Sequence, residues 1–102
     1  MKNITYFIEK NKSELIDSGF LLNLEEYHAY KEYLGIHIYI TEFSMKELGI
    51  FNINSVVIYF KGGDDNILLN KRYTYNFFSP KFKKINNFII KTVSRLSDNI
   101  TN

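Results

Sequence analysis

The sequence predicts a single α+β domain spanning residues 1–102, in which four antiparallel strands form one sheet and helices at both ends pack against it. Three observations lead to this fold class: a Gly/Asp-rich turn between two apolar runs at mid-chain, alternating apolar residues upstream, and a helical apolar stripe near the C-terminus. A chain of 102 residues can build one hydrophobic core but not two. No linker or repeat divides the chain, so we expect one domain.

Composition narrows the environment in which the protein works. The chain has no cysteine, which excludes disulfides, thiolate metal sites and a cysteine nucleophile. Its longest apolar runs are about five residues, against roughly 20 for a bilayer span, and the N-terminus lacks the apolar segment of a signal peptide. We therefore expect a cytoplasmic protein that neither spans nor binds a membrane.

A first helix is predicted over about residues 4–18. Asn3 is the expected N-cap and Gly19 the expected residue after the C-cap. The apolar stripe is interrupted at Asn11, which makes the amphipathic pattern weaker here than at the C-terminus. The apolar members of the stripe are Ile4, Phe7, Ile8 and Leu15.

Two strands follow, one from Phe20 to about Ala29 and one from Leu34 to Thr41, joined by a hairpin whose register decides where the histidines lie. A two-residue loop at Lys31–Glu32 places Glu26 opposite His37, with His28 beside it. A three-residue loop, or a bulge, places the leucines of the first strand with the aliphatic face and the two histidines on opposite sides of the sheet. We favour this second register, because each misplaced apolar side chain costs about 1.5–3 kcal/mol, whereas an exposed Glu–His pair contributes at most about 1 kcal/mol.

Between this hairpin and the central one lies a segment with two possible structures. Ser44 and Glu47 have the spacing of a capping box, and Gly49 can end a single helical turn. The alternative is a wide loop that ends at Phe51-Asn52-Ile53. The sequence alone does not decide between them.

The central hairpin is the strongest local signal. Val56–Phe60 and Ile67–Tyr75 flank the connection Gly62-Gly63-Asp64-Asp65-Asn66, whose residue types tolerate positive φ. The strand Val56–Phe60 carries bulky side chains on both of its sides, which predicts a central strand covered on two faces.

The C-terminal helix has the clearest pattern in the chain. Ser79 is the expected N-cap and Pro80 occupies the first helical position, where its missing N–H has no cost. The stripe that should lie along the sheet recurs at spacings of 3 and 4 and consists of Phe82, Ile85, Ile89, Val93, Leu96 and Ile100.

No catalytic set is visible in the sequence. A metal site at the two histidines would need Glu26 as a further ligand, and ordinary strand histidines are the simpler interpretation. Asp64 and Asp65 are explained by their turn. We therefore expect a protein that is not an enzyme and that needs neither a metal nor another cofactor.

Charge is divided along the chain. Residues 1–70 carry 6 Lys and 10 acidic residues, whereas residues 71–102 carry 7 basic residues and only Asp98 as an acid. Such asymmetry can mark a partner-binding surface, or the two parts can simply attract each other within the fold. Basic residues beside aromatic ones in the second part also permit nucleic-acid binding; this alternative rests on Lys71, Arg72, Lys81, Lys84, Lys91 and Arg95.

In size, composition and order of elements, the chain resembles the immunity proteins of bacterial polymorphic and contact-dependent growth-inhibition toxin systems. Asn, Ile, Lys, Tyr and Phe make up 54 of its 102 residues, as expected for an A/T-rich accessory gene. The resemblance implies a cytoplasmic protein that occludes the active site of one cognate toxin.

If the toxin is a nuclease with a basic cleft, the contact surface would be acidic and aromatic. The oligomeric state stays open. The residues expected to contact the toxin are Glu25, Glu26, Tyr27, Glu32, Tyr33, Glu42, Glu47, Asp64 and Asp65. The competing interpretation is a small phage or accessory nucleic-acid-binding protein that uses the basic C-terminal segment.

Overall fold

In the computed structural model, the centre of the chain is a hairpin of two long strands, β4 (Phe51–Lys61) and β5 (Ile67–Tyr75). The structure describes residues 6–47, 51–75 and 78–101. The predicted turn is confirmed: Gly62 N–H donates to Asn66 O, and Asp65 N–H donates to Gly62 O, both at 3.0 Å. Asp65 adopts a φ of +68°, which its short polar side chain tolerates.

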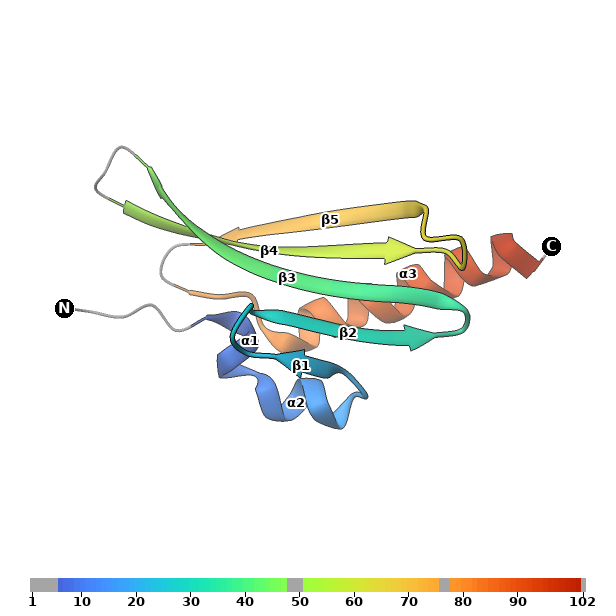
Figure 1. Ribbon diagram of the computed structural model, residues 1–102, viewed down its shortest axis with the longest axis horizontal. Coiled ribbons are helices and arrows are strands. Elements are labelled where there is room, and N and C mark those ends of the chain that lie inside the picture. Colours follow the sequence, from blue (N-terminus) through green and yellow to red (C-terminus); the bar gives the residue numbers. More distant parts are fainter. Residues whose placement is uncertain (1–5, 48–50, 76–77, 102) are drawn as a thin grey trace.

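Five antiparallel strands, not the four predicted, form the sheet in the order β1–β2–β3–β4–β5 (Figure 1). β1 (Leu21–Asn23), β2 (His28–Tyr33) and β3 (Ile36–Glu47) precede the hairpin. The predicted single strand from Phe20 to Ala29 is wrong because the chain turns back within it. Asn23 Oδ1 accepts a hydrogen bond from Glu26 N–H at 3.2 Å, and Tyr27 has a φ of +53°.

The β2–β3 hairpin has a register that neither predicted loop provides. Its two-residue loop is Leu34–Gly35, with φ of +54° and +80°, as in a type I′ turn. His28 pairs with Thr41, and Glu32 pairs with His37. Both histidines therefore lie on the same side of the sheet, and the prediction that they lie on opposite sides is wrong.

The segment after residue 43 is a strand. β3 continues to Glu47, which pairs with Phe51 of β4, and Ser44 pairs with Asn54. Neither of the two structures considered for this segment, a helical turn or a wide loop, is therefore found in the residues that the structure describes. Gly49 lies outside these residues.

The first helix is divided in two, α1 (Phe7–Lys10) and α2 (Lys12–Asp17). Asn11 breaks it, with a φ of −111°, and its side-chain Nδ2 donates to Phe7 O at 2.9 Å. The gap in the apolar stripe thus marks a real interruption of the helix. The predicted N-cap, Asn3, lies outside the described residues.

The end of α2 confirms the predicted role of Gly19. Gly19 has a φ of +98°, and its N–H donates to Ile16 O at 2.9 Å. Phe20 N–H donates to Leu15 O at 3.0 Å, which completes a Schellman motif. The motif brings Phe20 and Leu15 into the core.

The C-terminal helix, α3 (Phe82–Thr101), begins two residues later than Pro80 predicts. Its first described hydrogen bond runs from Ile85 N–H to Lys81 O at 3.2 Å, so Lys81 precedes the first turn. Within the predicted stripe, Ile85, Ile89 and Val93 are buried, while Phe82 and Leu96 pack at the margin of the core. Nothing is described for the side chain of Ile100.

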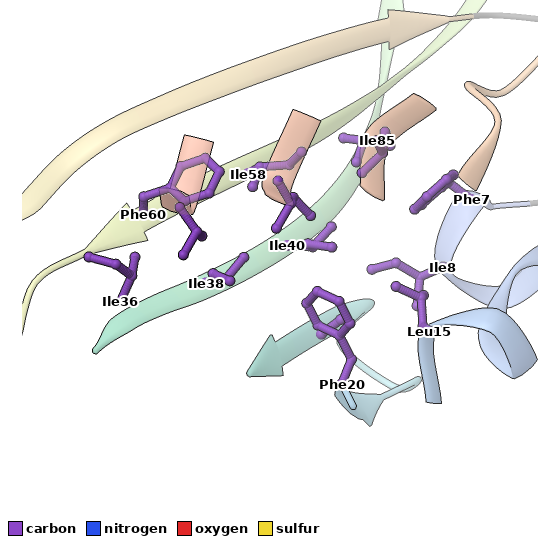
Figure 2. Packing of buried hydrophobic residues seen from close by; sticks show 14 residues of the cluster. Phe7, Ile8, Leu15, Phe20, Ile36, Ile38, Ile40, Ile58, Phe60 and Ile85 are labelled. Carbon is purple, nitrogen blue, oxygen red and sulfur yellow. The ribbon is translucent and has the colours of Figure 1, made fainter. Parts of the chain in front are cut away.

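The core lies between one side of the sheet and the three helices. Figure 2 shows the isoleucines of β3 and the apolar residues of β4 pointing at residues from α1, α2 and α3. The helices cover one side of β4, whereas the sequence predicted cover on both sides; no described helix packs on the other side (Figure 1). None of the helices in the described ranges combines the length and apolarity needed to cross a membrane.

Candidate functional site

The side of the sheet turned away from the helices is the candidate site. Strand register places one set of cross-strand neighbours on it, because successive residues of a strand point to opposite sides of the sheet. We call this set the open face. It consists of Tyr30, His37, Tyr39, Thr41, Phe43, Tyr59, Lys61 and Arg72.

Two tyrosines and a histidine form the centre of the open face. The rings of Tyr30 and Tyr39 lie 4.9 Å apart at an interplanar angle of 41°. The Tyr30 hydroxyl is hydrogen-bonded to His37 Nδ1 at 2.7 Å. Lys61 Nζ lies 5.0 Å from the centre of the Tyr39 ring, at the distance of a cation–π contact. These contacts restrict the rotamers of the aromatic side chains and present a defined surface.

Arg72 extends the open face towards the β3–β4 hairpin. Its guanidinium carbon lies 5.3 Å from the centre of the Phe43 ring. In the register, Val57 is the neighbour of Arg72, and Ser55 is the neighbour of Phe43. Both of these β4 residues are buried although no described helix covers them, so the side chains of the open face itself shield them from solvent.

Beside the tyrosines lies a shallow groove of about 340 Å³ across β1, β2 and β3. Its lining includes Asn23, His28, Tyr30, Tyr39 and Thr41. Burial raises the pKa of the Tyr30 hydroxyl, and Tyr39 and Glu32 add to the rise. The phenol therefore stays protonated at neutral pH and can exchange hydrogen bonds with a partner at the wall of the groove.

The acidic residues singled out in the sequence do not form one patch. Glu25 and Glu26 lie in the β1–β2 turn, with Tyr27 after them. At the opposite end of β2, Glu32 and Tyr33 precede the β2–β3 loop.

The remaining predicted contacts are elsewhere. Asp64 and Asp65 form the β4–β5 turn, where Asp64 Oδ2 accepts from Asn66 Nδ2 at 2.7 Å and Asp65 lies 3.7 Å from Lys61 Nζ. Glu47 ends β3, and nothing is described for its side chain.

Glu42, a predicted toxin contact, is instead in the interior, with 5% of its surface exposed. Its carboxylate accepts hydrogen bonds from Phe7 N–H at 2.7 Å and Ile8 N–H at 2.9 Å. It also accepts a bond from the Tyr75 hydroxyl at 2.6 Å. Tyr6, the residue at the N-cap of α1, provides no side-chain capping bond, so a carboxylate 35 residues away caps this helix. We call these contacts the Glu42 network.

Burial and hydrogen bonding act in opposite directions on Glu42. Burial raises the pKa of its carboxyl, and the bonds from Ile8, Tyr75 and Phe7 lower it without cancelling the rise. Burial and the bond to Glu42 raise the pKa of Tyr75 far above its usual value. Tyr75 therefore remains a donor to Glu42 throughout the physiological pH range.

The raised pKa predicts how stability changes with pH. An acid that holds its proton more tightly when folded contributes stability below its unfolded pKa and loses it as the pH rises through the folded pKa. We expect the free energy of unfolding of the wild type to fall relative to that of Glu42→Gln as the pH rises above about 4.3, the pKa of glutamate in an unfolded chain. Urea unfolding of both proteins at a series of pH values above this point measures the difference. A difference that grows in favour of the wild type as the pH rises would contradict the prediction.

Most of the basic residues of the nucleic-acid alternative lie on one side of α3 or directly before its first residue. Lys81, Lys84, Lys91 and Arg95 are exposed, and their spacings of 3, 7 and 4 place them in one stripe. We call them the basic stripe. Arg72 is separated from them because it belongs to the open face.

Lys71 of β5 lies beside the basic stripe. Its Nζ is 5.5 Å from the ring centre of Tyr73 and 5.9 Å from that of Phe88. Lys84 Nζ is 5.8 Å from the same Tyr73 ring. The structure thus brings basic and aromatic residues together between β5 and α3, as the nucleic-acid alternative requires.

The described residues contain no group of three or more His, Cys, Asp or Glu side chains placed to bind a metal. His28 Nδ1 lies 3.7 Å from Glu26 Oε1, and both side chains are largely exposed. His37 is engaged with Tyr30 instead. The two histidines therefore share a side of the sheet but serve different local contacts.

Sequence reasoning missed the open face because the predicted register of β2 and β3 was wrong, and it missed the Glu42 network for a different reason. The alternation Ile36, Ile38, Ile40 continues to Glu42, so the period of two already places this carboxylate on the aliphatic side. Its partners, the first amides of α1, are far away in sequence. The period could have identified Glu42 as buried, but no sequence signal names those partners.

Comparison with protein-family models, with curated proteins and with solved structures found no match for this chain.

Proposed function

We propose that this chain is a non-catalytic binding protein that contacts a partner protein through the open face, and that the partner is a toxin which it neutralises as an immunity protein. The observation that carries the proposal is a cluster of aromatic and basic side chains on a sheet surface that no described helix covers. Tyrosine and arginine are over-represented among the residues that dominate binding energy at protein interfaces.

The contacts within the open face support tight binding. Tyr30 is held by His37 and packs against Tyr39, and Lys61 covers the Tyr39 ring. Side chains already restricted in the free protein lose less conformational entropy when a partner binds. The regular strands beneath them supply a rigid platform, so the surface is prepared for one partner geometry.

Two acidic side chains lie at the margin of the open face, where they can contact basic groups of the partner. Glu32 pairs with His37 in the register, and Glu26 lies beside His28. Both acids are exposed. In the proposed complex these margin charges speed association, and the tyrosines determine how long the complex lasts. Glu42, being buried, has no part in the contact.

Two variants of different kinds test the proposal. Tyr59→Ala removes an anchor, and we expect affinity for the toxin to fall roughly 30-fold, or about 2 kcal/mol. Thr41→Arg adds bulk beside the groove and should weaken binding to a similar extent. The matched controls are Tyr33→Ala, a tyrosine on the other side of the sheet, and Ser94→Arg, which adds the same side chain to the exposed surface of α3.

The measurement starts with capture on tagged protein from an extract of the bacterium that makes it, with and without added nuclease. A retained polypeptide is purified, its enzymatic activity is assayed, and increasing amounts of wild type, variants and controls are added. The proposal predicts inhibition that is complete at one equivalent of wild type, weakened for Tyr59→Ala and Thr41→Arg, and unchanged for the controls.

Two results would contradict the proposal. A retained protein whose activity this chain leaves unchanged would exclude neutralisation. Recovery of nucleic acid alone, lost at moderate salt, would favour the alternative of a nucleic-acid-binding protein and assign binding to Lys71 and the basic stripe.

A further inference from the structure

The outer edge of β5 is the longest strand edge that no described element pairs. β5 (Ile67–Tyr75) pairs with β4 on one side and is the last strand of the sheet. The opposite edge strand, β1, has three residues, and α2 lies next to it (Figure 1). Unpaired backbone N–H and C=O groups along nine residues of β5 are available to another strand.

The first three residues of β5 have apolar side chains that are exposed to solvent. Ile67 is 55% exposed, Leu68 39% and Leu69 37%. Exposed aliphatic residues at the start of a long edge strand are a surface suited to pairing.

Charge decides which strand can pair there. Residues 67–97 contain 7 Lys or Arg and no acidic residue. Lys71 and Arg72 occupy the middle of β5, and neither has an acidic neighbour in the register: their partners on β4 are Ile58 and Val57. Basic residues of α3 add positive charge on the side of the sheet that Lys71 faces.

A second copy of this chain is a poor partner for the edge. Antiparallel pairing of two β5 strands about their centre places Lys71 opposite Lys71, or Lys71 opposite Arg72. Like charges directly opposite each other destabilise a strand pair. The same two residues thus oppose self-association and favour a strand of opposite charge.

We propose that the β5 edge binds an extended acidic segment of another polypeptide, which adds to the sheet as a sixth strand. Adjacent residues of a strand point to opposite sides of the sheet, as Lys71 and Arg72 do. Two consecutive acidic residues in the segment therefore face both basic side chains, and apolar residues beside them contact Ile67, Leu68 and Leu69. This site adjoins the open face at Arg72, but it does not depend on the identity of the partner proposed above.

The test uses synthetic peptides and the full chain labelled with ¹⁵N. The probe is a capped nine-residue peptide with two central glutamates flanked by alternating valine and threonine. We expect its titration to shift the amide signals of Ile67–Tyr75 and to show saturable binding. A second peptide with central lysines should bind at least tenfold more weakly, as should a Glu peptide N-methylated at alternate residues, which keeps the charge but cannot pair.

Charge reversal in the protein supplies the second arm. Lys71→Glu combined with Arg72→Glu should weaken binding of the Glu peptide at least tenfold and strengthen binding of the lysine peptide, which the wild type binds poorly. The matched control combines Lys10→Glu with Lys12→Glu, which changes the net charge equally on exposed positions of α1 and α2. Both double variants are first compared with the wild type by their NMR spectra.

Three outcomes would overturn the proposal. Equal binding of the N-methylated peptide would show attraction by charge without strand pairing. Absence of shifts in β5 at millimolar Glu peptide would show that the edge is closed. Binding of a single-stranded thymidine oligonucleotide at these residues, with no binding of the Glu peptide, would make the surface a nucleic-acid site.

Discussion

Replacing Glu42 with alanine is expected to lower the free energy of unfolding by about 3–5 kcal/mol. The variant leaves Phe7 N–H, Ile8 N–H and the Tyr75 hydroxyl without their acceptor. An unpaired buried donor costs about 1–3 kcal/mol, and bonds to a charged group are at the upper end of that range. Water entering the space recovers part of the loss, so the sum is smaller than three full penalties.

The loss should be local as well as global. Glu42 connects β3 to the first turn of α1, while Tyr75 connects it to β5, and Asn54 Nδ2 donates to the Tyr75 hydroxyl at 3.1 Å. Without Glu42, we expect the amides of Phe7 and Ile8 to exchange with solvent much faster than the amides of β3 and β4.

Urea unfolding and amide hydrogen exchange measure these effects. Glu9→Ala is the matched control, because Glu9 is an exposed carboxylate in the same helix. It should change stability by less than about 0.5 kcal/mol. Equal stability of Glu42→Ala and Glu9→Ala would show that the buried carboxylate does not hold α1 to the sheet.

The second large effect is expected at Phe60, where alanine should cost about 3–5 kcal/mol. Phe60 is fully buried on β4, next to Ile38 in the register, and its ring meets that of Phe88 edge-on at 5.9 Å between centroids. Truncation removes apolar contact area and leaves a cavity between sheet and helix, which the regular strands cannot close.

Phe78 offers a control of the same residue type, since it is 89% exposed. Phe78→Ala should change the free energy of unfolding by less than about 0.5 kcal/mol. Denaturant midpoints of the two variants, compared at equal m-values, test the pair. A loss at Phe60 no larger than that at Phe78 would mean that the core lies elsewhere.

Strong local patterns were enough to predict part of the fold. The residue types at Gly62–Asn66 identified the central turn, and the stripe through Ile85, Ile89 and Val93 identified the C-terminal helix. Both signals lie within short stretches of chain. The end of α2 at Gly19 was predictable for the same reason, because a glycine at positive φ is a local requirement.

The errors came from turns in which a non-glycine residue has a positive φ. The chain reverses between β1 and β2 at Tyr27, and between β2 and β3 at Leu34–Gly35, where leucine takes the first of the two positions. Tyrosine and leucine are rarely found in that conformation, so propensity rules did not predict either turn. Tertiary packing determines both turns instead. The two turns in turn determine the number of strands and the side of the sheet on which the histidines lie.

The candidate site depended on these same turns. The open face exists because the register aligns Tyr30, Tyr39 and Tyr59 across three strands. A shift of one residue would have placed them among the buried isoleucines. The basic stripe, by contrast, needs only the period of α3 and was visible in the sequence.

The most direct test of the open face as the contact surface is tyrosine NMR of the complex. The chain has 8 tyrosines, of which Tyr30, Tyr39 and Tyr59 belong to the open face. With ring-labelled tyrosine and the purified toxin, we predict that these three ring signals shift or broaden at one equivalent, while those of Tyr33 and Tyr73 keep their positions. Perturbation of Tyr33 and Tyr73, with the three open-face rings unchanged, would contradict the proposed mode of binding.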